Sequence, residues 1–321
     1  MKEIGGYFEL AYTNITVNSL HSTALKLNSG RNCLAYILQS RGYKKVYVPH
    51  YTCDVIIEQL VKYNIAFYYY NITENLEPHT LPAYSKEEAF LYVNYFGIKG
   101  DYIKLLAHTG LNLIIDNSQA LFSEQLANTD TFYSLRKFAG VTDGAFLYCN
   151  GPSIPLDYNK QYPGGGHLVT RKNFDARAGF DEFKINEAAF SELELGRMSP
   201  ATEAFITTFD FEKTRLARER NFLYLHNHLG NLNNLPLPDI RNLCGPLCYP
   251  FIVPNNGLRK KLIEESIFVP TFWPGLNVEN DTYEAYLVQN LLPLPIDQRY
   301  ELKDMQRIIE IISTKLTHHE Y

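Results

Sequence analysis

The first half of the chain alternates strand-like runs with helical patterns, and this alternation constrains the fold more than any other feature. In order, the pattern predicts a helix at 32–39, a strand at 45–49, a helix at 54–63, strands at 65–70 and 89–95, a helix at 101–108, and strands at 111–115 and 144–149. Strands separated by helices of this length form βαβ units and a parallel sheet. Right-handed crossovers then bring the loops that follow the strands to one edge, where open α/β sheets bind ligands.

The second half predicts a smaller α+β unit. Residues 161–167 are rich in glycine, and a plain loop is expected there because no strand-then-helix context supports a phosphate loop. One long helix is expected at 200–229. The remainder predicts a proline-rich linker (235–238), a strand (248–253), a helix (257–265), a strand (268–272) and a last helix (302–316). We therefore expect a large α/β domain over residues 1–195, and a connecting helix with a small domain over 196–321.

Composition excludes several classes of function. The 321 residues include 30 Lys+Arg and 35 Asp+Glu, and this mild acidity argues against a nucleic-acid partner. No apolar run is long enough to span a membrane, and the N-terminus lacks the apolar stretch of a signal peptide. Five cysteines favour a reduced, cytoplasmic location over a disulfide scaffold. Neither Cys244 and Cys248 nor His226 and His228 have the spacing of a zinc site, so no metal is expected.

Three motifs could carry chemistry. The turn at Gly30, Arg31 and Asn32 enters a helix, where free backbone N–H groups and the positive helix end bind phosphate. Asp116 closes a buried strand, where a carboxylate can face a ligand and hold a ring nitrogen protonated. Lys137 lies among apolar residues, where desolvation lowers the pKa of a lysine as Schiff-base chemistry requires. Each motif also has a structural interpretation: helix caps for the first two, and a surface lysine for the third.

In their order and contexts, the motifs resemble the DegT/DnrJ-type aminotransferases, which use pyridoxal phosphate (PLP) and have the aspartate-aminotransferase-like architecture of PLP fold type I. The resemblance runs through most of the chain. The segments that carry it are 28–34, 48–53, 93–97, 116–119, 137–144, 249–251 and 294–300. It implies an α/β fold with a mostly parallel sheet in a large PLP-binding domain, a small C-terminal α+β domain, and a homodimer.

The resemblance also implies a role for each site residue. Lys137 would form the Schiff base and shuttle protons. Asp116 would pair with the pyridinium nitrogen, and Gln119 would contact the phenolic oxygen of the cofactor. The turn Gly30-Arg31-Asn32 would bind the phosphate.

The chain departs from the family pattern at several positions. The phosphate-binding serine expected five residues before the lysine is Phe132, and Ser134 is the nearest serine. Cys53 stands where an aromatic residue stacks on the cofactor ring, with Tyr51 as a possible substitute. Leu195 stands where the neighbouring subunit usually supplies an asparagine.

These observations predict a cytoplasmic, PLP-dependent aminotransferase. Its amino donor would be glutamate, and its acceptor a keto-sugar nucleotide or a related small carbonyl compound. Two alternatives stay open: a catalytically silent binding or scaffold protein with the PLP fold, and a PLP-dependent sugar dehydratase, which Lys137 disfavours because relatives with that chemistry carry histidine there. The 24 tyrosines suit a core, an interface or a polar cleft. Five of them lie in or beside the strand-end segments: Tyr47, Tyr51, Tyr92, Tyr95 and Tyr133. Some of these hydroxyls could bind a polar substrate, but we expect most of the five to pack in the core or at a dimer interface.

Overall fold

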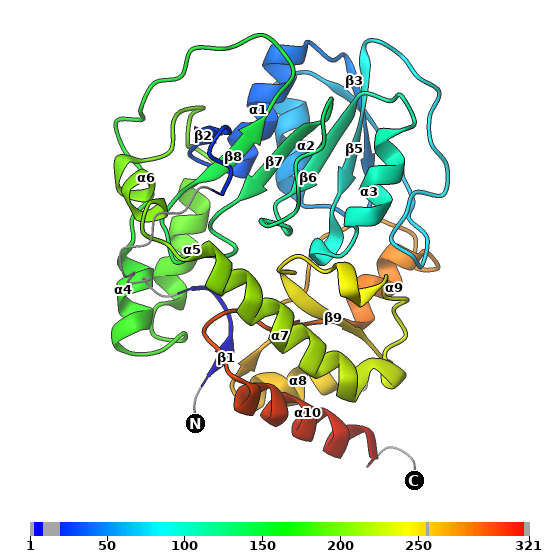
Figure 1. Ribbon diagram of the computed structural model, residues 1–321, viewed down its shortest axis with the longest axis vertical. Coiled ribbons are helices and arrows are strands. Elements are labelled where there is room, and N and C mark those ends of the chain that lie inside the picture. Colours follow the sequence, from blue (N-terminus) through cyan, green and yellow to red (C-terminus); the bar gives the residue numbers. More distant parts are fainter. Residues whose placement is uncertain (1–2, 9–19, 255–256, 318–321) are drawn as a thin grey trace.

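A seven-stranded sheet organises the N-terminal half of the chain. The computed structural model describes residues 3–8, 20–254 and 257–317, and Figure 1 shows the sheet above a second, smaller unit. The strands are β2 (Leu25–Leu27), β3 (Lys45–Pro49), β4 (Ala66–Tyr70), β5 (Glu88–Val93), β6 (Leu113–Asn117), β7 (Asp130–Ser134) and β8 (Ala145–Tyr148). Their order is β2-β8-β7-β6-β5-β3-β4. The β4-β3-β5-β6-β7 pairs are parallel, whereas β8 is antiparallel to both of its neighbours.

Helices connect these strands as the alternating pattern predicts. They are α1 (Gly30–Arg41), α2 (Asp54–Lys62) and α3 (Gly100–Ala107). Because β3, β5, β6 and β7 run in one direction, their carboxyl ends meet at a single edge. The mostly parallel α/β sheet is therefore confirmed, and its ligand-facing edge is the one that carries Asp116 and Ser134.

Two antiparallel strands and three helices form the core of the C-terminal unit. The strands are β9 (Cys248–Ile252) and β11 (Leu291–Pro295), and the helices are α8 (Leu258–Glu264), α9 (Tyr283–Asn290) and α10 (Leu302–Thr317). The first strand of the chain, β1 (Ile4–Gly5), pairs in parallel with β10 (Ile267–Phe268). The N-terminal residues therefore pack with the C-terminal unit, although they precede the large sheet in sequence.

The prediction of a single long helix at 200–229 is wrong. Two helices occupy this stretch, α6 (Pro200–Ile206) and α7 (Phe211–Leu229). Thr207 and Thr208 turn their hydroxyls back onto carbonyls of α6, and Asp210 caps α7 by accepting from the N–H of Lys213 at 2.9 Å. Side chains of this kind compete with the helical backbone and favour helix ends.

Three further helices were not predicted. They are α4 (Gly166–Asn173), which begins inside the expected loop at 161–167, α5 (Phe180–Ala189), and α9 (Tyr283–Asn290) in the C-terminal unit. The apolar residues of α5 do not line one face: Phe180 and Ile185 are exposed, and Asn186 is buried. A search for amphipathic spacing therefore misses this helix.

Most of the strand-end tyrosines pack in the core, as expected. Tyr51, Tyr92, Tyr95 and Tyr133 are all buried. Two of the hydroxyls donate to backbone carbonyls: that of Tyr92 to Leu76 at 2.7 Å, and that of Tyr95 to Tyr51 at 2.8 Å. These tyrosines thus combine apolar burial with hydrogen bonds to loop backbone.

Candidate functional site

Lys137 lies on a tight turn between β7 and β8. The turn is closed locally by the N–H groups of Phe138 and Ala139, which both donate to the carbonyl of Leu135. The Lys137 side chain is exposed, and its Nζ donates to Ser118 Oγ at 3.1 Å. Burial within this chain therefore does not desolvate the ammonium group, contrary to the environment expected from its apolar sequence neighbours.

Asp116 lies one strand away, at the buried end of β6. Its Oδ1 accepts the N–H of Ser118 at 2.7 Å, so Ser118 bonds both the acid and Lys137. Burial raises the pKa of Asp116, and the Lys137 cation and the Ser118 hydrogen bonds oppose the shift. The structure thus brings together the lysine and the aspartate that are 21 residues apart in sequence (137 − 116).

Asp143 and Gly144 hold the far end of the lysine turn. The fully buried Asp143 carboxylate accepts the Ser199 N–H at 2.7 Å and the Ser199 hydroxyl at 2.6 Å. Gly144 has φ of +119°, and a Cβ there would lie 3.0 Å from Thr202 Cγ2. The N–H of Gly144 donates to the carbonyl of Asn28 at 2.8 Å, which brings the start of α1 beside the lysine turn. The Asp-Gly pair of the motif is therefore a structural anchor.

The N-terminus of α1 retains two N–H groups that no described residue satisfies. Ser29 caps the helix by accepting the N–H of Asn32 at 3.2 Å. Within the described part of the chain, the N–H groups of Gly30 and Arg31 have no hydrogen-bond acceptor. The ring of Phe132 lies 3.7 Å from where a Cβ of Gly30 would be, so the phenylalanine that replaces the expected serine packs under this turn.

The side chains of Asn32 and Arg31 bond to other residues of the protein. Asn32 Nδ2 donates to Asn28 Oδ1 at 2.9 Å and to the carbonyl of Glu194 at 2.9 Å. Arg31 pairs with Glu58 of α2 at 3.6 Å. At this turn, an anion would therefore meet backbone N–H groups first. Because Glu194 directly precedes Leu195, this bond also places the segment around Leu195 against α1 of the same chain.

Gln119 is buried at the edge of the sheet where the parallel strands end, and it hydrogen-bonds the turn that contains Phe96. Its Oε1 accepts the N–H of Phe96 at 2.7 Å, which leaves its NH₂ group as the donor available to a ligand. Gly97, in the same turn at φ of +76°, approaches the Gln119 carbonyl so closely that a Cβ would lie 2.7 Å from it. Glycine is therefore required at this position.

Cys53 and Ser134 complete the set of predicted residues. Cys53 occupies the N-cap position of α2 without a side-chain capping bond, and it is half-buried. Burial raises the pKa of its thiol, and the nearby Lys137 cation opposes the shift. Ser134 ends β7 opposite Ala145, and its hydroxyl has no hydrogen-bond partner among residues 3–8, 20–254 and 257–317. Cys53 thus lies near Lys137, whereas Ser134 lies three residues before it on the adjoining strand.

Sequence reasoning overlooked Ser118, which bonds both Asp116 and Lys137. The available signal was its position inside the Asp-Asn-Ser-Gln motif, two residues beyond the strand-end aspartate. A residue at that offset can donate its N–H back to the carboxylate in an Asx turn, as Ser118 does.

A cavity of about 220 Å³ lies near the same edge but apart from the lysine. It is lined by Asn94 and Asn117, whose side chains bond each other at 2.9 Å, and by residues of α3 and the stretch 238–244. Successive strand residues point to opposite faces, so Asn117 and Asp116 lie on different sides of the sheet. This cavity is therefore separate from the lysine–aspartate pair.

The described residues hold neither a candidate metal cluster nor a candidate membrane-spanning helix. No cluster of three or more His, Cys, Asp or Glu side chains there could hold a metal ion. Among the same residues, no helix has both the length and the apolarity needed to cross a membrane.

Comparisons with known proteins identify the fold. No protein-family model and no curated protein sequence matches the chain. A DegT DnrJ EryC1 StrS aminotransferase from Brucella abortus matches with a TM-score of 0.59 and 15% identity, over 91% of this chain and 85% of that one. DesI, solved in the presence of its TDP-sugar product, matches at 0.63 and 15%, over 92% and 83%. Spr1654 from Streptococcus pneumoniae, solved in a PLP-form, matches at 0.63 and 14%, over 97% and 92%. The chain therefore has the fold of the sugar aminotransferases, PLP fold type I, as its sequence motifs implied.

Proposed function

We propose that this protein is a PLP-dependent aminotransferase that acts on a sugar-type carbonyl substrate. The observation that carries the proposal is the connection from Lys137 through Ser118 to Asp116, at the sheet edge beside the free N-terminal N–H groups of α1. A primary amine, a buried acid and an anion-binding helix end are the three groups that such chemistry needs. The comparisons support the proposal through the shared fold alone.

The residues present fit pyridoxal phosphate. The positive end of α1 and the N–H groups of Gly30 and Arg31 suit its phosphate. Gln119 can donate through its NH₂ group to the phenolic oxygen, and Asp116 suits the ring nitrogen. We propose that Cys53 contacts the cofactor ring and that Ser134 and Asn32 lie at its phosphate end, although the bonds of Asn32 make its contribution indirect.

Bound in this way, the cofactor supplies an electron sink for breaking bonds at the substrate carbon that carries the amino group. Asp116 contributes basicity: because burial raises its pKa, its carboxylate holds a shared proton more strongly than an exposed one would. A cationic ring nitrogen would also compensate for the solvation that this carboxylate loses on burial. The buried carboxylate of Asp116 would therefore be stabilised by the protonated ring nitrogen that the reaction requires.

Lys137 contributes a mobile amine. Among the described residues its exposed side chain is held only by the hydrogen bond from Nζ to Ser118 Oγ, so the amine can leave that hydroxyl and carry a proton to or from a reacting carbon. Ser118 then orients the amine towards Asp116 in the resting state. The exposed face of Lys137 is the side from which a substrate would arrive.

The finer assignment follows from the resemblance. We propose glutamate as the amino donor and a keto-sugar nucleotide as the acceptor, and the TDP-sugar in the DesI structure supports a nucleotide-linked sugar. We further propose a homodimer, as the resemblance implies, and a cytoplasmic location, as the five cysteines favour.

Amino-donor turnover tests the proposal. The purified protein is loaded with PLP and mixed with glutamate, and the change in the visible absorption of the cofactor is followed. We expect conversion by the wild type and by Lys213→Ala, which removes an exposed lysine of α7, and none by Lys137→Ala. A well-folded wild type that converts no donor would favour a silent binding protein, and conversion by Lys137→Ala would exclude this lysine as the catalytic one.

A further inference from the structure

Phe138, the residue after Lys137, anchors the lysine turn in the core. Its ring is fully buried and meets the ring of Phe122 edge-on, with centroids 5.7 Å apart. The guanidinium of Arg218, from α7, lies 4.5 Å from the centroid of the same ring. The Lys137 side chain is exposed, so the backbone position of the lysine depends on how Phe138 is held.

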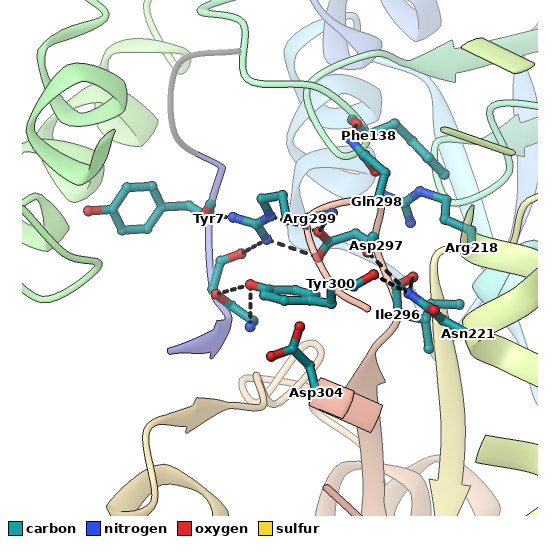
Figure 2. Close-up of polar contacts among 12 residues, drawn as sticks. Tyr7, Phe138, Arg218, Asn221, Ile296, Asp297, Gln298, Arg299, Tyr300 and Asp304 are labelled. Carbon is teal, nitrogen blue, oxygen red and sulfur yellow. Dashed lines mark hydrogen bonds and ion pairs between the residues drawn. The ribbon is translucent and has the colours of Figure 1, made fainter. Parts of the chain in front are cut away.

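Gln298, from the C-terminal unit, holds Phe138 through its backbone. Gln298 Nε2 donates to the carbonyl oxygen of Phe138 at 2.7 Å, and Figure 2 shows this side chain pointing at Phe138 beside Arg218. Its Oε1 is buried and has no hydrogen-bond partner in the described parts of the chain. The bond to Phe138 is therefore the one polar contact of the Gln298 amide among the described residues.

The loop that carries Gln298 is fixed on both sides of it. Asp297 and Arg299 form an ion pair at 2.7 Å, and Arg299 also donates to the carbonyl of Tyr7 at 2.9 Å. Asn221, from α7, donates to the carbonyls of Ile296 at 3.1 Å and Tyr300 at 3.0 Å, as Figure 2 shows. Gln298 therefore projects from a rigid loop that joins the N-terminal strand, α7 and the lysine turn.

The buried cation above Phe138 belongs to the same arrangement. Arg218 donates to the carbonyls of Pro246 and Leu247 at 3.2 and 3.0 Å, and its Nε has no partner among the described residues. Burial lowers the pKa of Arg218 to about 10, whereas the nearby Asp297 opposes the shift. Asp297 thus electrostatically favours the cation that lies over the Phe138 ring.

We propose that Gln298 is a positioning residue for Lys137, acting through the carbonyl of Phe138, with Arg218 holding the ring of the same residue. The inference rests on the proposed function, in which Lys137 is the reacting amine. It assigns to the C-terminal unit a part in aligning that amine with Asp116. Displacing a catalytic group by about 1 Å can slow a reaction by about 100-fold, so one hydrogen bond at this distance is enough to matter.

Two variants of Gln298 and one matched control test the proposal. Gln298→Glu keeps the side-chain length but removes the N–H donor, and Gln298→Ala removes the whole contact. Gln306→Ala is the control, because Gln306 lies on α10 and bonds only Tyr224 and Glu310 among the described residues. Thermal unfolding of each variant shows whether it is folded.

Three readouts are compared with the wild type. They are the pH dependence of the visible absorption of bound PLP, the rate of the glutamate half-reaction at saturating donor, and the acetylation rate of Lys137 in PLP-free protein, relative to Lys213, by mass spectrometry. We expect both Gln298 variants to bind PLP, to shift the pH dependence, and to react about 10- to 100-fold more slowly. The relative acetylation of Lys137 should change in both, and Gln306→Ala should match the wild type.

The outcomes separate this inference from the proposed function. If folded Gln298 variants match Gln306→Ala in all three readouts, Gln298 does not position the lysine, and the proposed function stands. If the wild type shows no PLP absorption that depends on Lys137, the proposed function fails. In that case the acetylation rate of Lys137 in the PLP-free protein still shows whether Gln298 holds the lysine turn.

Discussion

Replacing Asp143 with alanine tests how the lysine turn is anchored. Its buried carboxylate accepts four hydrogen bonds, from the Ser199 N–H (2.7 Å), the Ser199 hydroxyl (2.6 Å), the Thr202 hydroxyl (2.5 Å) and the Thr142 hydroxyl (3.3 Å). Together these bonds tie the end of the turn to the start of α6. Asp143→Ala removes all four acceptor contacts at once.

The magnitude follows from which donors can find new partners. The hydroxyls of Ser199 and Thr202 already lie 3.1 Å apart and can still bond each other. The Ser199 N–H is buried and has no such substitute, and a stranded donor costs about 1–3 kcal/mol. Losing the two short hydroxyl bonds adds about 1–2 kcal/mol. The addition is no larger because the variant no longer has to desolvate a buried carboxylate on folding. We therefore expect a loss of about 3 kcal/mol in the free energy of unfolding.

Urea unfolding followed by circular dichroism measures this loss. Ser199→Ala is the comparison, because it removes the helix cap but leaves the backbone N–H bonded to Asp143, and it should cost about 1 kcal/mol. If Asp143→Ala costs less than Ser199→Ala, the carboxylate is not the anchor, and the reasoning is refuted.

Three further substitutions test other parts of the site. Gly144→Ala should destabilise the fold by about 2–4 kcal/mol in urea unfolding, because φ is +119° and the added Cβ would lie 3.0 Å from Thr202 Cγ2; a neutral result would contradict this geometry. Asn32→Ala should cost about 2 kcal/mol, through its lost bonds to Asn28 and Glu194, while PLP affinity in a fluorescence titration stays close to wild type; a large loss of affinity would make its side chain a direct ligand. Asp116→Asn should stabilise the PLP-free protein by about 1 kcal/mol at neutral pH and abolish tight PLP binding. Burial raises the folded-state pKa of Asp116, so its ionisation costs stability as pH rises from the unfolded-state pKa of about 3.9 through the folded-state value. The gain from Asp116→Asn should therefore vanish below about pH 4, and a gain that persists there would have another cause.

Several strand ends could be predicted because each is marked locally, whereas β7 (Asp130–Ser134), the strand that leads into the lysine turn, was not predicted. The strand at 45–49 was predicted with its observed bounds, since its β-rich run leads directly to a proline. Once β6 and β7 are adjacent parallel strands, Asp116 and the turn after β7 must lie at one edge. The closeness of Asp116 and Lys137 therefore follows from topology together with two motifs.

The partners of the site residues could not be predicted, because they are distant in sequence. The sequence places Asn32 in a phosphate-binding turn, yet its amide donates to the carbonyl of Glu194. Phe132 occupies the position where the family has a serine, yet its ring packs under Gly30. Gln298 carries no local signal that it contacts Phe138, 160 residues earlier. Periodicity and turn chemistry describe neighbours along the chain, and tertiary contacts of this kind have no local pattern.

Chemical trapping tests the central claim, that Lys137 is the amine that holds the cofactor, most directly. The protein is mixed with PLP and reduced with borohydride, which fixes the cofactor to whichever amine has joined its aldehyde, and the labelled peptide is identified by mass spectrometry. We predict a single label on Lys137, absent from Lys137→Ala and retained in Lys213→Ala. A label on another lysine, or equal labelling of the wild type and Lys137→Ala, would contradict the account.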